Sequence, residues 1–243
     1  KVPKRVRRQR PVVGDFVAFT TDPEPRLLAV LPRRTELTRR AAGRANVPQI
    51  IAANVDYALL VAGLDGDFNP RRLERYLALV TQAGVEPLVV LNKVDLCADP
   101  EAARTRAEQA APEVPTFVCS AATGDGIDAL AAALSPGRTV VLLGSSGAGK
   151  STLVNRLLGE ERMAVGEVRA SDNKGRHTTT ARELVALPAG ALLIDTPGLR
   201  ELALWDTELE GAFPDVEELA QACRFADCRH EDEPGCAVAA AIA

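Results

Sequence analysis

The sequence predicts an α/β protein, in which a parallel sheet is covered by helices on both faces. A small β module precedes the sheet and a short cysteine-rich segment follows it. Two observations predict the sheet: from Asn54 onward buried apolar strands alternate with helical stretches, and a Gly-x-x-x-x-Gly-Lys-Ser motif lies between one strand and the next helix. The 243 residues are 47% hydrophobic and 26% charged, a globular composition that suits one large domain or two smaller ones.

The individual elements follow from local patterns in chain order. The β module has two short predicted strands, 12–19 and 26–31, separated by a turn-rich stretch with Pro23 and Pro25. In the central part we expect strands at 57–62, 87–91, 116–119, 139–143 and 191–194, and helices at 71–83, after Pro100, at 127–134 and after Gly149. The chain starts at Lys1 and stops within the apolar run 237–243, which resembles a helix cut short, so we expect both termini to be incomplete.

Charge is distributed unevenly along the chain. Residues 1–48 hold 12 Lys and Arg against 4 Asp and Glu, so the remaining residues are strongly negative although the whole chain carries only −4. This asymmetry favours a polyanion as partner of the N-terminal part; the alternative is a solvated basic face. No apolar run approaches the roughly 18 to 20 residues that span a bilayer, and no signal core follows the basic start, so we expect a cytoplasmic protein without a membrane partner.

The glycine-rich motif, residues 144–151, predicts a phosphate cradle. Its glycines allow successive backbone N–H groups to point at phosphate oxygens, and the following helix adds the partial positive charge of its N-terminus. In such a cradle Lys150 contacts the β and γ phosphates and Ser151 binds Mg²⁺. The alternative is a glycine-rich turn with a solvated lysine. The predicted binding residues are Gly144, Ser145, Ser146, Gly147, Ala148, Gly149, Lys150, Ser151 and Thr152.

A second motif indicates which base is bound. Asn92-Lys93-Val94-Asp95 directly follows a buried strand, and the Asp95 carboxylate can accept from both N1–H and the exocyclic amine of guanine. Adenine would present an acceptor to that carboxylate and leave a charge unpaired, so guanine is the predicted base. A further strand ends in Ser120-Ala121, a pair that resembles the backbone contact of guanine-nucleotide sites to the base oxygen.

A third motif, Asp195-Thr196-Pro197-Gly198, ends another apolar strand. Asp195 can hold a water of Mg²⁺, and the Gly198 N–H can meet the γ phosphate. Between cradle and Asp195, residues 165–180 form a candidate switch loop in which one of the threonines at 178–180, with Thr179 and Thr180 as the candidates, covers the magnesium ion. The alternative is an ordinary turn whose threonines cap backbone groups.

The motifs occur in a permuted order, because the base-specifying Asn92 precedes the cradle at Gly144, whereas in the familiar small GTPases it comes late. Permutation is tolerated since the termini of a compact α/β domain often lie close together. The chain then runs from Gly198 into the cysteine cluster, so we expect the nucleotide state to be transmitted to the C-terminal segment.

Four features together resemble the RsgA (YjeQ) family of small-subunit-dependent GTPases over nearly the whole chain: the permuted order, residues 175–180, residues 195–199 and the cysteine cluster. The resemblance implies an N-terminal OB-fold at 1–48, here lacking its first strands, a permuted GTPase domain at 49–209 and a zinc-binding, mostly helical module at 210–243. It also implies hydrolysis of GTP to GDP in late maturation of the small ribosomal subunit, with that subunit and its rRNA as partners. We expect the protein to be a monomer.

The position that usually orients the attacking water is occupied by an unusual residue. Leu199 stands where many GTPases carry a glutamine, and its side chain cannot hydrogen-bond. His177 on the candidate switch loop could orient or deprotonate water; alternatively it packs on the loop or touches rRNA, or a potassium ion assists. Arg176 could act as an arginine finger or pair with an rRNA phosphate. We therefore expect slow intrinsic turnover that a partner completes.

The cysteine cluster predicts a structural zinc site. Cys223, Cys228, His230 and Cys236 supply three thiolates and an imidazole, a closed set of four ligands. The alternatives are chance clustering and a redox-active pair. Cys97 and Cys119 lie apart and are expected to be small core residues.

The N-terminal arginines suit phosphate recognition, and only Phe16 and Phe19, at least one of them expected to point inward, could stack on bases. Three functions compete: a GTPase coupled to ribosome assembly, a GTP-gated rRNA-binding scaffold in which hydrolysis is incidental, and a GTP-dependent metal or membrane-targeting factor. The first is expected, and the third is disfavoured because neither an amphipathic anchor nor a His-rich tract occurs.

Overall fold

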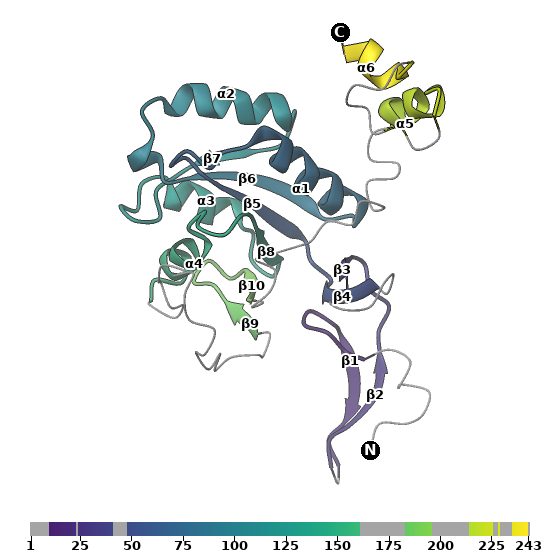
Figure 1. Cartoon of the computed structure of the whole chain (residues 1–243). Helices are drawn as coiled ribbons and strands as arrows, with labels where there is room; N and C mark the ends of the chain where they lie inside the picture. Colours follow the sequence, from purple (N-terminus) through teal and green to yellow (C-terminus); the bar gives the residue numbers. More distant parts are fainter. Residues whose placement is uncertain are drawn as a thin grey trace, which may run out of the picture. The chain divides into compact units, whose positions relative to one another are not determined.

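A computed structural model of the chain describes residues 10–22, 24–40, 48–160, 183–195, 214–225, 228 and 235–242. The chain divides into two compact units, residues 1–203 and 204–243, and each is described by itself. The first unit contains the sheet and its helices, and the second contains the short helices α5 (Pro214–Gln221) and α6 (Ala237–Ile242) (Figure 1). The cysteine cluster belongs to the second unit.

The centre of the first unit is a six-stranded sheet with the order β7-β6-β5-β8-β10-β9 (Figure 1). Pairings among β7, β6, β5, β8 and β10 are parallel, and the edge strand β9 runs antiparallel to β10. The bounds are Tyr57–Gly63 for β5, Glu86–Asn92 for β6, Thr116–Val118 for β7, Thr139–Leu143 for β8, Glu183–Ala186 for β9 and Leu192–Asp195 for β10. The predicted parallel sheet is confirmed, whereas β9, only four residues long, escaped the sequence pattern.

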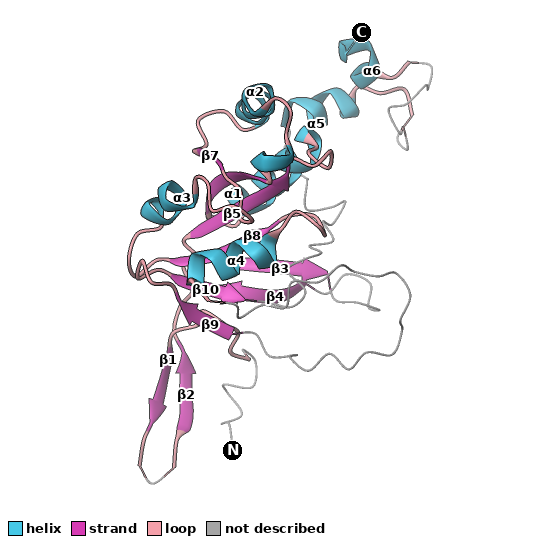
Figure 2. Cartoon of the chain, turned by 90° about the vertical axis from the view of Figure 1, so that its left-hand side faces the viewer, coloured by secondary structure: helices cyan, strands magenta, loops and turns pink. Residues whose placement is uncertain are grey.

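Within the described residues, four helices follow strands of this sheet, and local signals start two of them. Asn69 and Asp99 cap the N-termini of the first two helices through side-chain oxygens, and a proline follows each cap. The bounds are Pro70–Gln82 for α1, Pro100–Ala110 for α2, Ile127–Ala133 for α3 and Lys150–Leu158 for α4; all can be traced in Figure 2.

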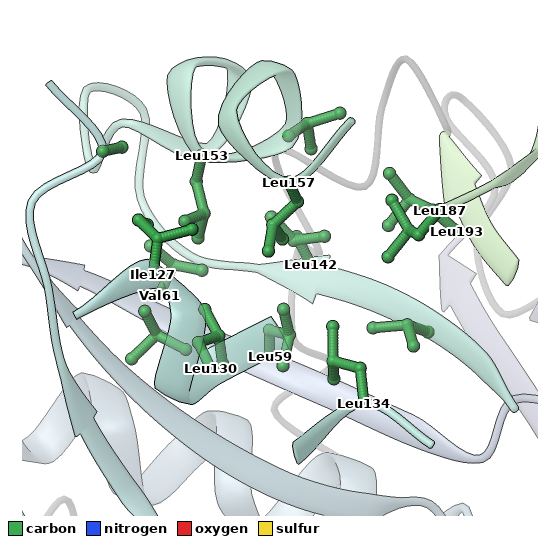
Figure 3. Close-up of a cluster of buried hydrophobic side chains, with 14 of the residues drawn as sticks. Leu59, Val61, Ile127, Leu130, Leu134, Leu142, Leu153, Leu157, Leu187 and Leu193 are labelled. Atoms are coloured by element: carbon green, nitrogen blue, oxygen red, sulfur yellow. The ribbon is translucent and has the colours of Figure 1, made fainter. Parts of the chain in front are cut away.

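The helices cover both faces of the sheet because strand side chains alternate. Leu60 of β5 belongs to one buried cluster, which includes residues of α1 and α2. Its neighbours Leu59 and Val61 belong to a second cluster, which includes residues of α3 and α4. In Figure 3, Leu153 and Leu157 of α4 point toward this second face. The strands are therefore apolar at consecutive positions, as expected for a sheet buried on both sides.

The N-terminal part contains two pairs of antiparallel strands, β1 (Val17–Thr20) with β2 (Arg26–Val30) and β3 (Glu36–Arg40) with β4 (Pro48–Ala53). The predicted strand at 12–19 begins only at Val17, because Gly14, with φ at 90°, lies in a turn in which the Asp15 N–H donates to the Val12 carbonyl at 3.2 Å. β3 and β4 were not predicted from the sequence.

The expectation that Phe16 or Phe19 points inward is wrong, since they are 60% and 59% exposed. Phe19 lies in β1 and Phe16 directly before it, in a two-stranded sheet whose strands pair with no further strand among the described residues.

Polar side chains join the N-terminal strands to the central sheet. Arg33 donates to both carboxylate oxygens of Asp15, Nε–Oδ1 at 2.6 Å and Nη2–Oδ2 at 2.9 Å, and both side chains are almost completely buried. Asn54, just before β5, donates to the Gly14 carbonyl and accepts from the Arg34 N–H, both at 2.9 Å. We call Asp15, Arg33 and Asn54 the junction, because they link residues 12–16, the segment before β3 and the start of β5.

The described part of the second unit has two short helices, α5 (Pro214–Gln221) and α6 (Ala237–Ile242). Among the described residues of this unit, Cys236 and Val238 are the buried apolar side chains. Within the described part of the chain, no helix is both long enough and apolar enough to cross a membrane.

Candidate nucleotide-binding site

The sequence-predicted site residues lie along one edge of the six-stranded sheet. Asn92 is the last residue of β6, Asp195 ends β10, Gly144 directly follows β8, and Ser120 is the second residue after β7. Since these strands are parallel, their carboxyl ends meet at the same edge, where open α/β sheets bind ligands. Segments distant in sequence are thereby brought to one place.

The cradle, residues 144–151, turns from β8 into α4 through glycines that the fold requires. A Cβ at Gly144 would lie 2.2 Å from the Val61 carbonyl oxygen, and one at Gly149 would lie 2.3 Å from Asn92 Nδ2. Both glycines also have positive φ, 153° and 86°. No side chain fits at either position, so the chain can approach β5 and Asn92 only with glycine there.

The cradle is electropositive because of one side chain and one helix end. The Lys150 ammonium lies within the loop and donates to the carbonyls of Ser145 and Gly144, the latter at 2.7 Å. Ser151 and Thr152 follow in the first turn of α4, where backbone N–H groups and the helix dipole favour an anion. Ser146 and Gly147 are exposed at the tip of the loop. The arrangement can bind phosphate groups.

Asn92 links the cradle to the segment after β7. Its side chain is fully buried; Nδ2 donates to the Ala148 carbonyl and Oδ1 accepts from the Ala121 N–H, each at 2.9 Å. An asparagine side chain carries a donating NH₂ group and an accepting oxygen on one planar amide, so it can bridge a backbone carbonyl and a backbone N–H. The residue that begins the base-specifying motif thus holds phosphate and base segments together.

Two carboxylates that sequence reasoning missed follow β5. Asp65 forms an ion pair with Lys93, and the hydrogen bond from Lys93 lowers the pKa of Asp65 below its usual value. Asp67 accepts from the Ser145 hydroxyl and pairs with Arg72 at 3.0 Å. A signal was present, since Asp-Gly-Asp follows a buried strand at its carboxyl end, where polar side chains reach the site.

The pair Ser120-Ala121, predicted to make the backbone contact to the base oxygen, begins the segment Ser120–Gly124, which we call the base loop. Its neighbour Arg156, on α4, donates from Nε to the Ala121 carbonyl at 3.1 Å and from Nη2 to the Ala122 carbonyl at 2.6 Å. Ala121, Ala122, Thr152 and Arg156 line a pocket of about 360 Å³. Sequence reasoning missed Ala122 and Arg156, which lie in no motif that it used.

Asp95, the residue predicted to read guanine, is exposed in the 3-10 helix η2 (Val94–Leu96). Lys93 before it adopts a left-handed conformation with φ at 66°, which turns the chain out of β6. Five other predicted site residues lie outside the described residues: His177, Thr179, Thr180, Gly198 and His230.

Three cysteines of the second unit lie together. The sulfur atoms of Cys223, Cys228 and Cys236 are within 4.8 Å of one another, a spacing compatible with shared metal coordination. Hydrogen bonding from the backbone near Val238, together with the neighbouring thiols, lowers the pKa of Cys223 to about 7. By contrast, burial raises the pKa of Cys119 to about 11, as suits a thiol in the core.

Comparisons with known proteins identify relatives of this chain. The model of the RsgA GTPase family matches residues 30–205. Small ribosomal subunit biogenesis GTPase RsgA of Opitutus terrae is 54% identical and that of Xylella fastidiosa (strain 9a5c) is 56% identical, each over 97% of this chain and over 68% and 69% of the relative. Among solved structures, YjeQ from Thermotoga maritima matches with a TM-score of 0.65 and 29% identity over 98% of this chain and 79% of its own. YloQ, a circularly permuted GTPase, matches with a TM-score of 0.56 and 27% identity over 98% of this chain and 76% of its own.

Fold, motif order and site together define a circularly permuted P-loop GTPase, that is, an enzyme that binds and hydrolyses GTP. Within that class, the match over most of the chain shows that this chain belongs to the RsgA GTPase family. The resemblance noted from the motifs is thereby confirmed.

Proposed function

We propose that this protein hydrolyses GTP to GDP and phosphate during late maturation of the small ribosomal subunit in the cytoplasm, and that the subunit stimulates its turnover. The observation that supports the GTP part is the pair of hydrogen bonds of Asn92, which donates from Nδ2 to the Ala148 carbonyl of the cradle and accepts at Oδ1 from the Ala121 N–H of the base loop. The ribosomal part is supported by relatives at 54% and 56% identity whose names state small ribosomal subunit biogenesis.

Each predicted residue has a role in this proposal. Lys150 and the start of α4 hold the phosphates, Asp95 accepts from guanine N1–H and its amine, and Ser151 with Asp195 holds Mg²⁺. Hydroxyl and carboxylate oxygens suit that hard cation, which when bound neutralises charge on the phosphates. Thr179, Thr180 and Gly198 are proposed to sense the γ phosphate, and His177 to orient water. Stimulated turnover that His177→Ala leaves unchanged would exclude the last role.

The partner is proposed to be the small subunit and its rRNA. Ten arginines lie in residues 1–48, and guanidinium groups bind phosphate in a planar, two-donor geometry. We also propose a division into an RNA-binding module at 1–48 with an OB-fold, a GTPase domain at 49–209 and a zinc module at 210–243, in a monomer.

The decisive experiment is single-turnover GTP hydrolysis by the protein alone, with small subunits, with large subunits and with free rRNA. We expect acceleration by small subunits only. Binding to small subunits that depends on GTP, but without acceleration of hydrolysis, would instead support a GTP-gated rRNA-binding scaffold. Equal acceleration by large subunits would contradict the proposed partner.

We further propose that Cys223, Cys228, His230 and Cys236 hold one structural Zn²⁺. The three described thiols converge, and the lowered pKa of Cys223 favours the thiolate that zinc requires. A chelator should therefore melt the second unit and leave GDP binding intact, as followed by thermal unfolding and nucleotide titration. Zinc should be retained at pH 8 and released as the pH falls below about 6, because the thiolates become protonated. Loss of GDP binding together with the metal would contradict an independent zinc module.

A further inference from the structure

The backbone amides of the base loop are nearly all engaged. The Ala121 N–H donates to Asn92 Oδ1 at 2.9 Å, the Thr123 N–H to Ser120 Oγ at 3.1 Å, and the Gly124 N–H to the Ser120 carbonyl at 2.8 Å. The Ala122 N–H, in contrast, donates to no group among the residues that the structure describes. Ala122 is therefore the position in this loop from which the backbone can donate to a ligand.

Arg156 holds the two carbonyls on either side of that amide. Its Nε donates to the Ala121 oxygen at 3.1 Å and its Nη2 to the Ala122 oxygen at 2.6 Å. The guanidinium also lies over Gly124, where a Cβ would be 3.7 Å from Nη1. A planar group with several fixed donors can bind successive carbonyls in this way, which the single ammonium of lysine does less well.

One peptide group connects Arg156 to the free amide. The Ala121 carbonyl and the Ala122 N–H belong to the same planar trans peptide, so they point in opposite directions. When Arg156 binds the carbonyl, it sets the direction of the N–H on the other side. A hydrogen bond from a charged donor to the carbonyl also polarises the peptide, which makes its N–H a stronger donor.

Arg156 also connects this peptide to the phosphate end of the site. It lies on α4, the helix that begins at Lys150 in the cradle. Together with Thr152 and the two alanines it lines the pocket of about 360 Å³ beside the base loop. The base loop is thus held on one side by Asn92 and on the other by Arg156.

We propose that Arg156 is a positioning residue for guanine recognition: it orients the Ala121–Ala122 peptide so that the Ala122 N–H donates to the 6-oxygen of the base. The proposal rests on the proposed function, since it requires a guanine nucleotide in this site. It assigns to Arg156 an effect on the base alone, transmitted through the loop, and no contact with the phosphates.

The test compares GDP with 2-aminopurine riboside 5′-diphosphate, which lacks the 6-oxygen and the N1–H, so each variant is compared with wild type on the same nucleotide. Affinities of the full chain, with Arg156→Ala and Arg156→Lys beside wild type, are measured by competition against a fluorescent GDP. We expect the Kd for GDP to rise about three- to tenfold in both variants, the size of one or two modest hydrogen bonds. The Kd for the 2-aminopurine nucleotide should change less than about twofold, because that base has no acceptor for the Ala122 N–H.

Arg104→Ala is the matched control, because Arg104 lies on exposed α2 and pairs with Glu108 at 2.8 Å, with no part in the site. It should leave both affinities unchanged. If the Arg156 variants weakened the affinity for both nucleotides equally, Arg156 would act on the structure of α4 in general. If they changed neither affinity, Arg156 would have no role in nucleotide binding. Either result overturns the proposal. The comparison is internal to each variant, so partial loss of stability does not obscure it. Failure of the wild-type chain to bind GDP at all would contradict the proposed function instead.

Discussion

Two buried asparagines, Asn92 and Asn54, lie at opposite ends of the central sheet and use the same hydrogen-bonding device. Asn92 ends β6 at the carboxyl edge, and Asn54 precedes β5 at the other edge. The exposed fractions are 0% and 2%, and each side chain donates to one carbonyl and accepts from one N–H at 2.9 Å. Because a buried polar group needs hydrogen-bond partners, each of these side chains connects segments that are distant in the sequence.

What differs is the segments that each asparagine joins. Asn92 binds two segments of the nucleotide site, whereas Asn54 binds Gly14 and Arg34, which belong to the N-terminal part. Asn54 also has a left-handed backbone, with φ at 52°, which asparagine tolerates better than most residues. The same pair of side-chain hydrogen bonds therefore supports the candidate nucleotide site at one edge and attaches the proposed RNA-binding module at the other. The two functions should be separable by mutation.

The largest effect is expected for Asn92→Ala. The substitution leaves the buried Ala148 carbonyl and Ala121 N–H without their partner, at a cost of about 2 to 4 kcal/mol in unfolding free energy. We expect GDP affinity to fall more than about 100-fold, because cradle and base loop lose their common support. Isothermal titration with GDP and chemical denaturation measure the two effects. Unchanged GDP affinity in a folded variant would show that the two segments hold their places independently.

Arg33→Met should have the next largest effect, on stability rather than on nucleotide binding. It leaves the buried Asp15 carboxylate without its cation, which costs about 3 kcal/mol. The double substitution Asp15→Leu and Arg33→Met removes both charges and should recover most of that loss. We expect the Kd for GDP to change less than about twofold in both proteins. If the single and double variants were equally unstable in denaturant titrations, the ion pair would not be the cause.

A smaller effect is expected for Asn54→Gly, which removes the side chain but keeps the left-handed backbone accessible. The lost hydrogen bonds should lower the unfolding free energy by about 1 to 2 kcal/mol. Asn54→Ala should cost about 1 kcal/mol more, because alanine resists positive φ. GDP binding should be unchanged, while stimulation of hydrolysis by small subunits should fall. Loss of GDP binding in Asn54→Gly would abolish the distinction between the two asparagines.

The smallest effect concerns pH. Burial by itself raises the pKa of Asp15, but the hydrogen bonds from Arg33 and the Val12 N–H outweigh it and lower the pKa below its ordinary value near 3.8. The unfolded chain then binds a proton more readily, so the contribution of Asp15 is complete above pH 4 to 5 and is lost as the pH falls through the lowered pKa. Compared with Asp15→Asn, the wild-type chain should lose at most about 1 kcal/mol between pH 5 and 3. A stability difference that stays constant with pH would exclude this role.

Much of the fold could be predicted from local patterns. The sequence predicts strands of consecutive apolar residues, such as Val89 to Leu91, and the starts of α1 and α2, which prolines mark. Each of these features depends on residues that are neighbours in the sequence. β3, β4 and β9 were missed. β3 contains Thr38, Arg39 and Arg40, so its pattern is polar, and only its pairing with β4 makes it a strand.

The residues of the candidate site also fall into those that the sequence predicted and those that only the structure showed. Residues 144–151 and Asn92 were found because phosphate and base chemistry dictates residue types at short spacings. Asp65, Asp67 and Arg156 were not found, because their partners Lys93, Ser145 and Ala121 lie at least 28 positions away and the Asp-Gly-Asp signal after β5 belongs to none of the motifs used. His177, Thr179 and Thr180 rest on sequence alone and remain predictions.

The sequence by itself determined the class of fold, the ligand and the permuted order of motifs. Apolar periodicity and short chemical motifs each depend on residues that are close together in the sequence. Only the tertiary structure decided which amide of the base loop is available, that Asn92 and Arg156 hold this loop from two sides, and that Asn54 repeats the same device at the other edge. The physical reason is that a buried polar group must find a partner wherever the chain brings one, and sequence separation does not indicate where that is.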